Sequence, residues 1–253
     1  MCGIAGILYF DKTRQVDSSL LERMCSVIHH RGPDDWGSWL DGYVGVGMKR
    51  LKIIDLEGGR QPMENAGGYL HIVFNGEIYN YRELRKGLQD KGYQFNSLSD
   101  TETILCAFEE YGEGCVSRLR GMFAFAIWDA RRRRLFIGRD RFGKKPLHYL
   151  LDNDKLIFGS EIKSILTHPE VRPEVNRLAV AQYLSCGYVP DPETMFKGIN
   201  KLPPGHTLNF HEGKADVKPY WDIHFQPDDT RQDENIYVAD VDRLLREAVK
   251  IRM

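Results

Sequence analysis

The sequence predicts an α+β fold built from layered antiparallel sheets, and three observations favour it. Apolar and polar residues alternate over many short segments, which is typical of strands with one buried face. Tight turns such as Asp41-Gly42 and Asp152-Asn153-Asp154 join several of these segments into hairpins. Segments of helical periodicity interrupt the hairpins without following every strand, so a parallel βαβ winding is not expected.

Eight strands are expected, in chain order, at residues 2–9, 36–41, 43–50, 69–74, 121–129, 135–140, 146–151 and 156–159. Four consecutive arginines, residues 131–134, connect two of these strands. Such a run can indicate nucleic-acid binding, but its place between two apolar segments favours a solvated hairpin tip.

Helices are expected between the hairpins. The first follows Asp17, and its apolar face consists of Leu20, Leu21, Met24, Val27 and Ile28. Asn80 with Glu83, and Ser99 with Glu102, have the spacing of capping boxes that begin two further helices. Two more helices fit residues 160–167 and 176–186.

The end of the chain differs from the rest. The segment 201–205 contains two prolines and a glycine, and residues 226–234 are polar and typical of a linker. A helix is expected from Glu234, with an apolar face and no capping residue before Met253. We therefore expect one domain at residues 2–210, followed at residues 211–253 by a connector and the first helix of a further, absent domain.

Composition excludes several classes of protein. The chain has 35 Lys and Arg against 36 Asp and Glu, so neither a nucleic-acid nor a membrane partner is expected. No apolar run is long enough to span a bilayer. The five cysteines are odd in number and form no CxxC pair, which predicts free thiols, no metal site and a cytoplasmic location.

Cys2 is a candidate nucleophile. Removal of Met1, which cells carry out readily before small side chains, would leave Cys2 with both a thiol and a free α-amine. The ordinary pKa of such an amine is about 7.7–8.0, which suits a general base at neutral pH. For Cys2 alone, the alternative is a small apolar residue at the start of a buried strand.

Three other positions could serve the same chemistry. Asn75-Gly76 follows the strand expected at 69–74, where an amide and a backbone N–H could stabilise an oxyanion, although Asn-Gly is also a common hairpin turn. Arg50 ends another strand and could bind a carboxylate, or could be an exposed edge residue. Asp100 lies at a helix start and could pair with a ligand ammonium, or could simply cap the helix.

Several longer segments occur together in one order: CGIAG at 2–6, HRGPDD at 30–35, RLKIID at 50–55, QPM at 61–63, FNGEIYN at 74–80, SDTE at 99–102, GMFAFA at 121–126, RDRFG at 139–143 and KPL at 145–147. In this set the chain resembles the N-terminal glutaminase domain of glutamine-hydrolysing asparagine synthetases. These are class II glutamine amidotransferases, enzymes with an N-terminal nucleophile. The resemblance extends over residues 2–222.

The resemblance implies a four-layer αββα sandwich of two antiparallel sheets, the fold of N-terminal nucleophile hydrolases. The catalytic residues of the family match Cys2, Asn75 and Gly76, and its substrate-binding residues match Arg50, Leu51, Ile54, Asn75, Gly76, Glu77 and Asp100. In these roles Cys2 attacks the glutamine amide, while Asn75 and Gly76 stabilise the oxyanion. Arg50 would bind the α-carboxylate of glutamine, and Asp100 its α-amine.

The implied reaction converts glutamine to glutamate and ammonia through a thioester on Cys2, without a cofactor in this chain. In the family an ATP- and magnesium-dependent second domain, absent here, uses that ammonia to make asparagine from aspartate. Two alternatives stay open: a related amidotransferase whose acceptor is another carboxylate or a sugar phosphate, and a catalytically dead regulatory module. Sugar-phosphate and phosphoribosylpyrophosphate enzymes typically carry a different segment at the position of residues 49–55. A homodimer also stays open.

Overall fold

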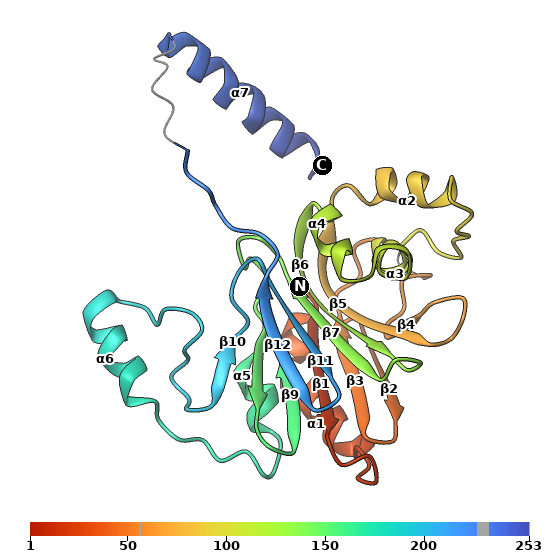
Figure 1. Ribbon diagram of the computed structural model, residues 1–253, viewed down its shortest axis with the longest axis vertical. Helices are drawn as coiled ribbons and strands as arrows, with labels where there is room; N and C mark the ends of the chain where they lie inside the picture. The colour runs from red at the N-terminus through yellow and green to blue at the C-terminus, as the bar shows by residue number, and fades with distance from the viewer. Residues whose placement is uncertain (56, 227–232, 253) are drawn as a thin grey trace.

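Two six-stranded antiparallel sheets form the centre of the molecule (Figure 1). The structure, a computed structural model, describes residues 1–55, 57–226 and 233–252. The first sheet has the order β10-β8-β9-β1-β3-β2, and the second has the order β12-β11-β7-β6-β5-β4. The strands are β1 (Gly3–Tyr9), β2 (Asp35–Asp41), β3 (Val44–Arg50), β4 (Met63–Glu64), β5 (Leu70–Ile78), β6 (Gly121–Asp129), β7 (Arg134–Arg139), β8 (His148–Leu151), β9 (Lys155–Gly159), β10 (Ile199–Lys201), β11 (His206–His211) and β12 (Lys214–Pro219).

The helices lie outside the two sheets, and most of them cover the outer faces. They are α1 (Ser18–Ser26), α2 (Tyr81–Gln89), α3 (Asp100–Tyr111), α4 (Cys115–Arg118), α5 (Ile162–Leu166), α6 (Arg177–Cys186) and α7 (Glu234–Lys250). One apolar cluster joins α1 and α5 to β1, and another joins α2, α3 and α4 to β5, β6 and β7. A third cluster fills the space between the sheets. The layers are therefore α, β, β and α, which confirms the predicted sandwich.

All eight predicted strands are present, with ends that differ by a few residues. The short strands β4 and β10 and the hairpin of β11 and β12 were not predicted from the sequence. β11 pairs with β7 and β12 pairs with β11, so the second sheet continues through residue 219. The predicted division of the chain near residue 210 stays a prediction.

The two predicted capping boxes do not form. Asn80 precedes α2, but its amide bonds the backbone of Arg118 and Arg120 instead of the helix start. Ser99 caps α3 by accepting from the N–H of Thr101, whereas the Glu102 carboxylate accepts from backbone N–H groups of the preceding loop. Tertiary partners have replaced the local bonds that the spacing predicted.

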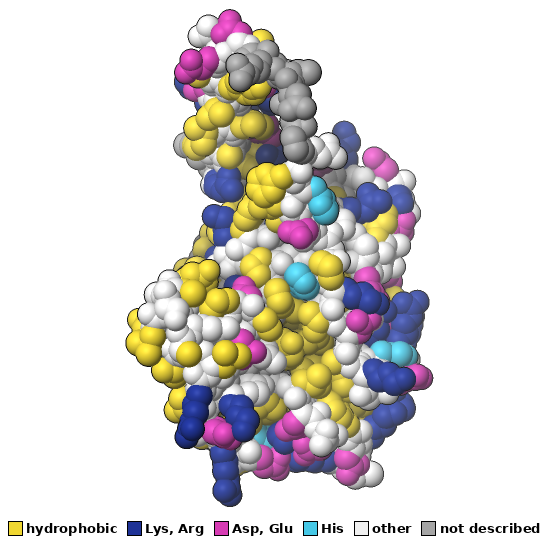
Figure 2. Space-filling model, turned by 60° about the vertical axis from the view of Figure 1, so that its left-hand side comes forward, with side chains coloured by type: hydrophobic (Ala, Val, Ile, Leu, Met, Phe, Trp, Pro, Cys, Tyr) yellow, Lys and Arg dark blue, Asp and Glu magenta, His cyan; other side chains and the backbone are white. Residues whose placement is uncertain are grey.

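The helix predicted near the end of the chain is α7, which lies apart from the sheets at the top of Figure 1. It contacts the rest of the described chain through an ion pair between Glu247 and Arg120, 2.8 Å long. Its apolar side chains, including Val241 and Leu245, are exposed, and Figure 2 shows them gathered on this helix. Among the described helices, none has the length and apolar character needed to cross a bilayer.

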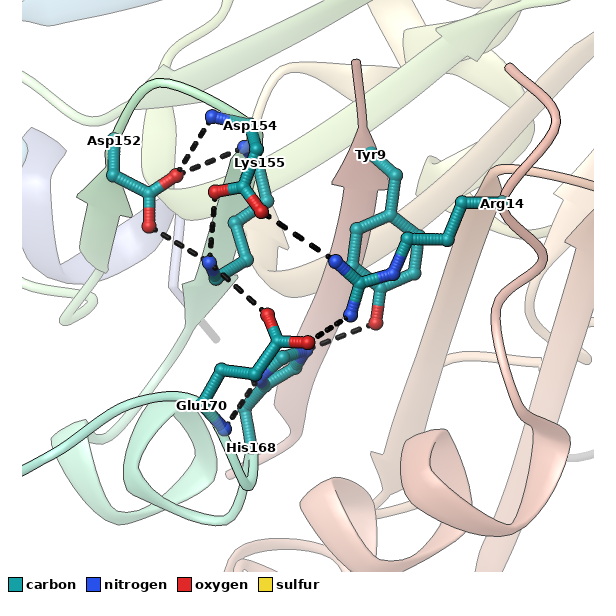
Figure 3. A network of polar contacts seen from close by, with 7 residues as sticks. All are labelled: Tyr9, Arg14, Asp152, Asp154, Lys155, His168 and Glu170. Carbon is teal, nitrogen blue, oxygen red and sulfur yellow. Dashed lines mark hydrogen bonds and ion pairs between the residues drawn. The ribbon is translucent and has the colours of Figure 1, made fainter. Parts of the chain in front are cut away.

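A buried lysine secures the turn between β8 and β9 (Figure 3). Lys155 is only 5% exposed, and its ammonium contacts Asp152 at 2.9 Å, Asp154 at 2.9 Å and Glu170 at 3.2 Å. Partial burial by itself would raise the pKa of Asp152, but hydrogen bonds from Lys155 and from backbone N–H groups lower it to about 2. The three carboxylates thus compensate the positive charge of Lys155, whose burial would otherwise destabilise the fold.

Arg14 extends this network toward β1. Its guanidinium bonds Glu170 at 2.5 Å and lies 3.7 Å from the centroid of the Tyr9 ring. The Tyr9 hydroxyl in turn lies 2.9 Å from Nε2 of His168. The network therefore joins β1 to the chain that follows α5, at the end of the sandwich where β1 finishes.

We expect Lys155→Met to lower the free energy of unfolding at pH 7 by about 1–2 kcal/mol, because the three carboxylates are partly exposed and lose only part of their stabilisation. The folded pKa of Asp152, about 2, lies below its ordinary value of 3.8, so this stabilisation is present above pH 4. The difference between wild type and variant should therefore shrink from pH 4 to pH 2, as measured by urea unfolding.

Lys197→Met is the matched control, because Lys197 also pairs with a carboxylate, that of Glu174, but both side chains are about two-thirds exposed. It should change stability by less than about 0.5 kcal/mol. If the difference in free energy of unfolding between wild type and Lys155→Met stayed constant down to pH 2, the proposed stabilisation of Lys155 by ionised carboxylates would be contradicted.

Candidate active site

All the residues singled out in the sequence as catalytic or substrate-binding line one cavity. Its volume is about 160 Å³, the space of a small ligand. The predicted residues in its wall are Cys2, Arg50, Leu51, Ile54, Asn75, Gly76, Glu77 and Asp100. They come from the chain before β1, the end of β3 and the segment after it, the second half of β5, and the start of α3.

Strand alternation turns Cys2 and Asn75 toward the same space. In β1, Ile4 and Leu8 belong to the cluster between the sheets, so Cys2 lies on the same face and packs against that cluster. In β5, Val73 belongs to the same cluster, and Asn75, two residues on, therefore also faces the gap between the sheets. The two side chains meet at one end of the sandwich core.

Hydrogen bonds hold both the main chain and the thiol of Cys2. Its carbonyl accepts from Nε of Arg31 at 2.9 Å, and Arg31 is itself paired with Glu161 at 3.0 Å. Its Sγ lies 3.4 Å from the backbone N of Leu51 and 3.6 Å from the carbonyl oxygen of that residue. Burial raises the pKa of the Cys2 thiol, whereas the Leu51 N–H and the charge of Arg50 act in the opposite direction.

Met1 lines the same cavity, but its side chain is 55% exposed. Its α-amine is partly buried, which lowers the pKa of that amine below 8.0. The residue therefore lies at the mouth of the cavity, where removing it would free the amine of Cys2 and leave the packed core in place.

Asn75 is completely buried, and neither atom of its side-chain amide has a hydrogen-bond partner among the described residues. An unsatisfied buried polar group costs about 1–3 kcal/mol, so such a group is usually explained by a ligand or a water that completes it. The alternative of a hairpin turn at Asn75-Gly76 does not apply, and the strand expected at 69–74 is longer than predicted: β5 continues to Ile78 and pairs Asn75 with Ala124. The long partner strand β6 has overridden the turn preference of Asn-Gly.

The N–H of Gly76 faces the edge of β5 opposite β6, beyond the residues that pair with β4. On that edge the N–H of Phe74 donates to Oε1 of Gln61 at 2.7 Å, and the N–H of Ile78 donates to Asp100 at 2.9 Å. Because N–H groups alternate along a strand, the Gly76 N–H points the same way and lies between these two bonds. A Cβ on Gly76 would lie 2.2 Å from the carbonyl oxygen of Met122, so β6 approaches too closely for a side chain.

Arg50 is not the exposed edge residue that one interpretation expected, because it is only 4% exposed. Its Nη2 donates to the carbonyl oxygens of Ile54 at 3.1 Å and Asp55 at 2.7 Å. A Cβ on Gly59 would lie 2.3 Å from this nitrogen, so the following segment closes tightly around the guanidinium. These contacts fix a positive charge in the wall of the cavity.

Asp100 supplies a negative charge to the same cavity. The simple capping interpretation is wrong, since Ser99 is the N-cap and the Asp100 carboxylate accepts from the N–H of Ile78. Burial raises the pKa of Asp100 to about 6; the nearby charge of Glu77 acts in the same direction, and the Ile78 hydrogen bond opposes it. A buried carboxyl beside a second acid is well suited to a cationic ligand group.

Gln61, Gly59 and Lys145 also contribute to the cavity but were not singled out as site residues. Gln61 joins two walls, because its Nε2 donates to Oγ1 of Thr101 at 3.1 Å while its Oε1 accepts from Phe74. Gln61 and Lys145 lie within segments recognised in the sequence, but periodicity gave no sign that they face the cavity. No cluster of three or more potential metal ligands occurs among the described residues.

The arrangement is suited to an α-amino acid that bears a carbonyl group on its side chain. Arg50 and Asp100 can bind a carboxylate and an ammonium, respectively. Cys2 can attack a carbonyl carbon, and the amide of Asn75 and the N–H of Gly76 can donate to the oxygen that becomes negative.

Comparison with known proteins agrees with this chemistry. Residues 1–221 match the sequence model of the family described as glutamine amidotransferase domain. The chain is 40% identical over 252 residues to asparagine synthetase [glutamine-hydrolyzing] 3 of Bacillus subtilis, covering 98% of this chain and 41% of that protein. It is 36% identical over 272 residues to amidase chry2 of Gibberella zeae, covering 100% of this chain and 39% of that protein.

Among solved structures, the glutamine phosphoribosylpyrophosphate amidotransferase of B. subtilis, complexed with ADP and GMP, superposes with a TM-score of 0.62. The identity is 17%, and the match covers 87% of this chain and 49% of that one, so the likeness concerns the fold. The chain spans about two-fifths of the length of the curated relatives it matches.

We expect Asp100→Asn to stabilise the ligand-free chain at pH 8 by about 1–2 kcal/mol, because asparagine can accept the Ile78 N–H without a buried charge. The folded pKa of Asp100, about 6, lies above its ordinary value of 3.8. Between pH 4 and pH 6 the unfolded chain loses this proton more readily than the folded chain, so the stability falls over this range; the penalty is complete above pH 6 and absent below pH 4. Urea unfolding at pH 4 and pH 8 measures the difference. The control is Asp90→Asn, at the exposed end of α2, and an equal gain at both pH values would contradict the prediction.

Proposed function

The chain belongs to the family of glutamine amidotransferase domains, and we propose that it hydrolyses the side-chain amide of glutamine to glutamate and ammonia, with Cys2 as the nucleophile. The observation that carries the proposal is the buried, unpartnered amide of Asn75, which shares a cavity with the Cys2 thiol. Arg50 and Asp100 line the same cavity and are suited to the two charges of an amino acid.

The proposed reaction requires the removal of Met1, after which the α-amine of Cys2 is the general base. The amine accepts the thiol proton, through a water molecule, and the thiolate attacks the amide carbon of glutamine. Asn75 and Gly76 donate hydrogen bonds to the resulting oxyanion. The ammonium returns a proton to the leaving nitrogen, ammonia departs, and the carbon–sulfur bond remains as a γ-glutamyl thioester. Water, deprotonated by the same amine, then attacks the thioester and releases glutamate and the thiol.

The amino-acid end of glutamine would occupy the charged part of the cavity. The Arg50 guanidinium, held by the carbonyl of Ile54, binds the α-carboxylate. Asp100 and the backbone at Glu77 receive the α-ammonium, whose charge would favour the ionised form of Asp100. Leu51 lines the cavity, and its backbone N–H contacts the Cys2 thiol.

In the full-length protein we infer that the ammonia serves an ATP- and magnesium-dependent domain that makes asparagine from aspartate. The identity to glutamine-hydrolysing asparagine synthetases supports this inference, as does the exposed apolar face of α7, which is suited to packing against a further domain. A second candidate is amidation of a different carboxylate, since the amidases chry2 and chyE match at 36% and 37% identity. The complete set of cavity residues argues against a dead module.

The five cysteines are unpaired in the structure, which supports a reducing, cytoplasmic location. No cofactor is needed for glutamine hydrolysis by this mechanism. A homodimer stays a prediction.

The direct test is glutamine turnover by the chain that begins at Cys2, with the removal of Met1 checked by intact mass. Ammonia release should be lost in Cys2→Ala, and a diazo-ketone analogue of glutamine should add once, to the peptide that contains Cys2. Cys186→Ser is the control, because Cys186 is exposed at the end of α6 and should be dispensable. Labelling at Cys186, or turnover by Cys2→Ala, would refute the nucleophile.

We expect Asn75→Ala to lower kcat by about 10²–10³ with little change in KM, because the amide oxygen of glutamine becomes fully negative only in the tetrahedral intermediate. Asn75→Asp should be at least as severe, since it would place a carboxylate against the oxyanion. Steady-state kinetics and circular dichroism on both folded variants make the comparison. Near-normal turnover by Asn75→Asp would rule out the oxyanion role.

A further inference from the structure

Lys145 is a buried cation that the mechanism above does not use. It lies between β7 and β8, is 5% exposed, and lines the cavity together with Met1, Cys2 and Glu77. A lysine ammonium inside a catalytic cavity changes the electrostatic potential at every titratable group there, whether or not it touches them.

The backbone of Lys145 is fixed on both sides. Its N–H donates to Oδ2 of Asp140 at 3.0 Å, and its carbonyl accepts from Nε of Arg139 at 2.9 Å. The Asp140 carboxylate also accepts from the N–H of Phe123, in β6, and from that of Lys144. Asp140 thus connects the backbone of Lys145 to β6, the strand that pairs with β5. The side chain of Lys145 extends into the cavity from this fixed backbone.

The ammonium itself makes no hydrogen bond or ion pair within the part of the chain that the structure describes. Lys155 is buried to the same extent but contacts three carboxylates (Figure 3). Burial lowers the pKa of Lys145; Arg31 acts in the same direction, while Glu77, Cys2 and Asp140 raise it.

An ammonium that faces a narrow cavity and has no protein partner is less well solvated than one on the open surface. Its presence beside a nucleophile therefore suggests a use for the charge itself.

We propose that the Lys145 ammonium activates Cys2 electrostatically, by favouring the thiolate over the thiol and the neutral α-amine over the ammonium. The first effect favours formation of the nucleophile. The second keeps the amine in the unprotonated form that can accept the thiol proton, and favours the passage of that proton to the leaving nitrogen. Lys145 neither gives nor takes a proton in this role.

The charge of Lys145 acts in the proposed direction on both groups. Burial has the largest effect on the pKa of the Cys2 thiol and raises it, whereas the Leu51 N–H, the terminal amine and the charges of Arg50 and Lys145 lower it. At the amine that ends the chain, on Met1, burial, Lys145 and Arg31 lower the pKa, and Cys2 and Asp34 raise it. Lys145 therefore lowers the pKa of both groups.

The inference rests on the proposed function, because it concerns the same nucleophile, but its test does not require turnover. In the chain that begins at Cys2, the rate of alkylation of Cys2 by iodoacetamide is measured from pH 5 to pH 10 by mass spectrometry of the Cys2 peptide. Lys145→Met should shift the midpoint of this profile upward by about one pH unit, and slow alkylation at pH 7 about tenfold. Lys145→Arg, which keeps the charge, should stay near the wild-type midpoint.

The matched control is Lys144→Met, which removes the neighbouring, exposed lysine and should leave the midpoint unchanged. In active protein, the acid limb of the kcat/KM profile for glutamine should also move to higher pH in Lys145→Met, since the amine would protonate more readily. Circular dichroism checks folding, and Lys145→Gln replaces Lys145→Met if the latter does not fold. An unchanged alkylation midpoint in a folded, neutral variant would overturn the proposal, whereas a shifted midpoint without glutamine turnover would refute only the proposed function.

Discussion

The pairing of β5 with β6 is the constraint on which the rest of the site depends. It runs without interruption from Leu70 opposite Asp129 to Ile78 opposite Gly121. Because strand geometry alternates, this register sends the Asn75 side chain into the space between the sheets and the Gly76 N–H to the edge of β5 opposite β6, beyond the short strand β4. A shift of one residue would exchange these directions, so that neither group could reach a ligand beside Cys2.

The other parts of the cavity are attached to the same pair of strands. Gln61 and Asp100 accept hydrogen bonds from the N–H groups on either side of Gly76 along this edge. The bond to Asp100 brings the start of α3 to the edge of β5. Asp140 bonds Phe123 of β6 and the backbone of Lys145. The buried Asn75 amide, which lacks a hydrogen-bond partner among the described residues, lies here, whereas the Lys155 ammonium, outside the site, contacts three carboxylates. The favourable contacts at the far end of the sandwich can offset the free energy that this amide in the cavity costs.

Much of this organisation could be predicted from the sequence. Apolar alternation located the central strands because their faces are buried on one or both sides, and the recognised segments contain the residues from Cys2 to Asp100 that line the cavity. The end of β5 was predicted too early, at residue 74 instead of Ile78, because the turn preference of Asn75-Gly76 was weaker than pairing with the long neighbouring strand β6. β11 and β12 follow a segment rich in proline and glycine, and their outer residues are polar, so their alternation was weak. The burial of Arg50 and Lys145 depends on contacts between distant segments, which no local pattern reports.

Met1 must be removed before the proposed site can act, which sets it apart from the other residues of the cavity. On the proposed mechanism it acts as a propeptide one residue long: the protein folds with its core complete, yet stays latent until a protease exposes the amine. Met1 is half-exposed, and the Cys2 carbonyl is held by Arg31 independently of it. On this mechanism, a peptide tag fused in front of Cys2 would give a folded protein without glutaminase activity. A tag for activity measurements therefore belongs at the C-terminus of the chain.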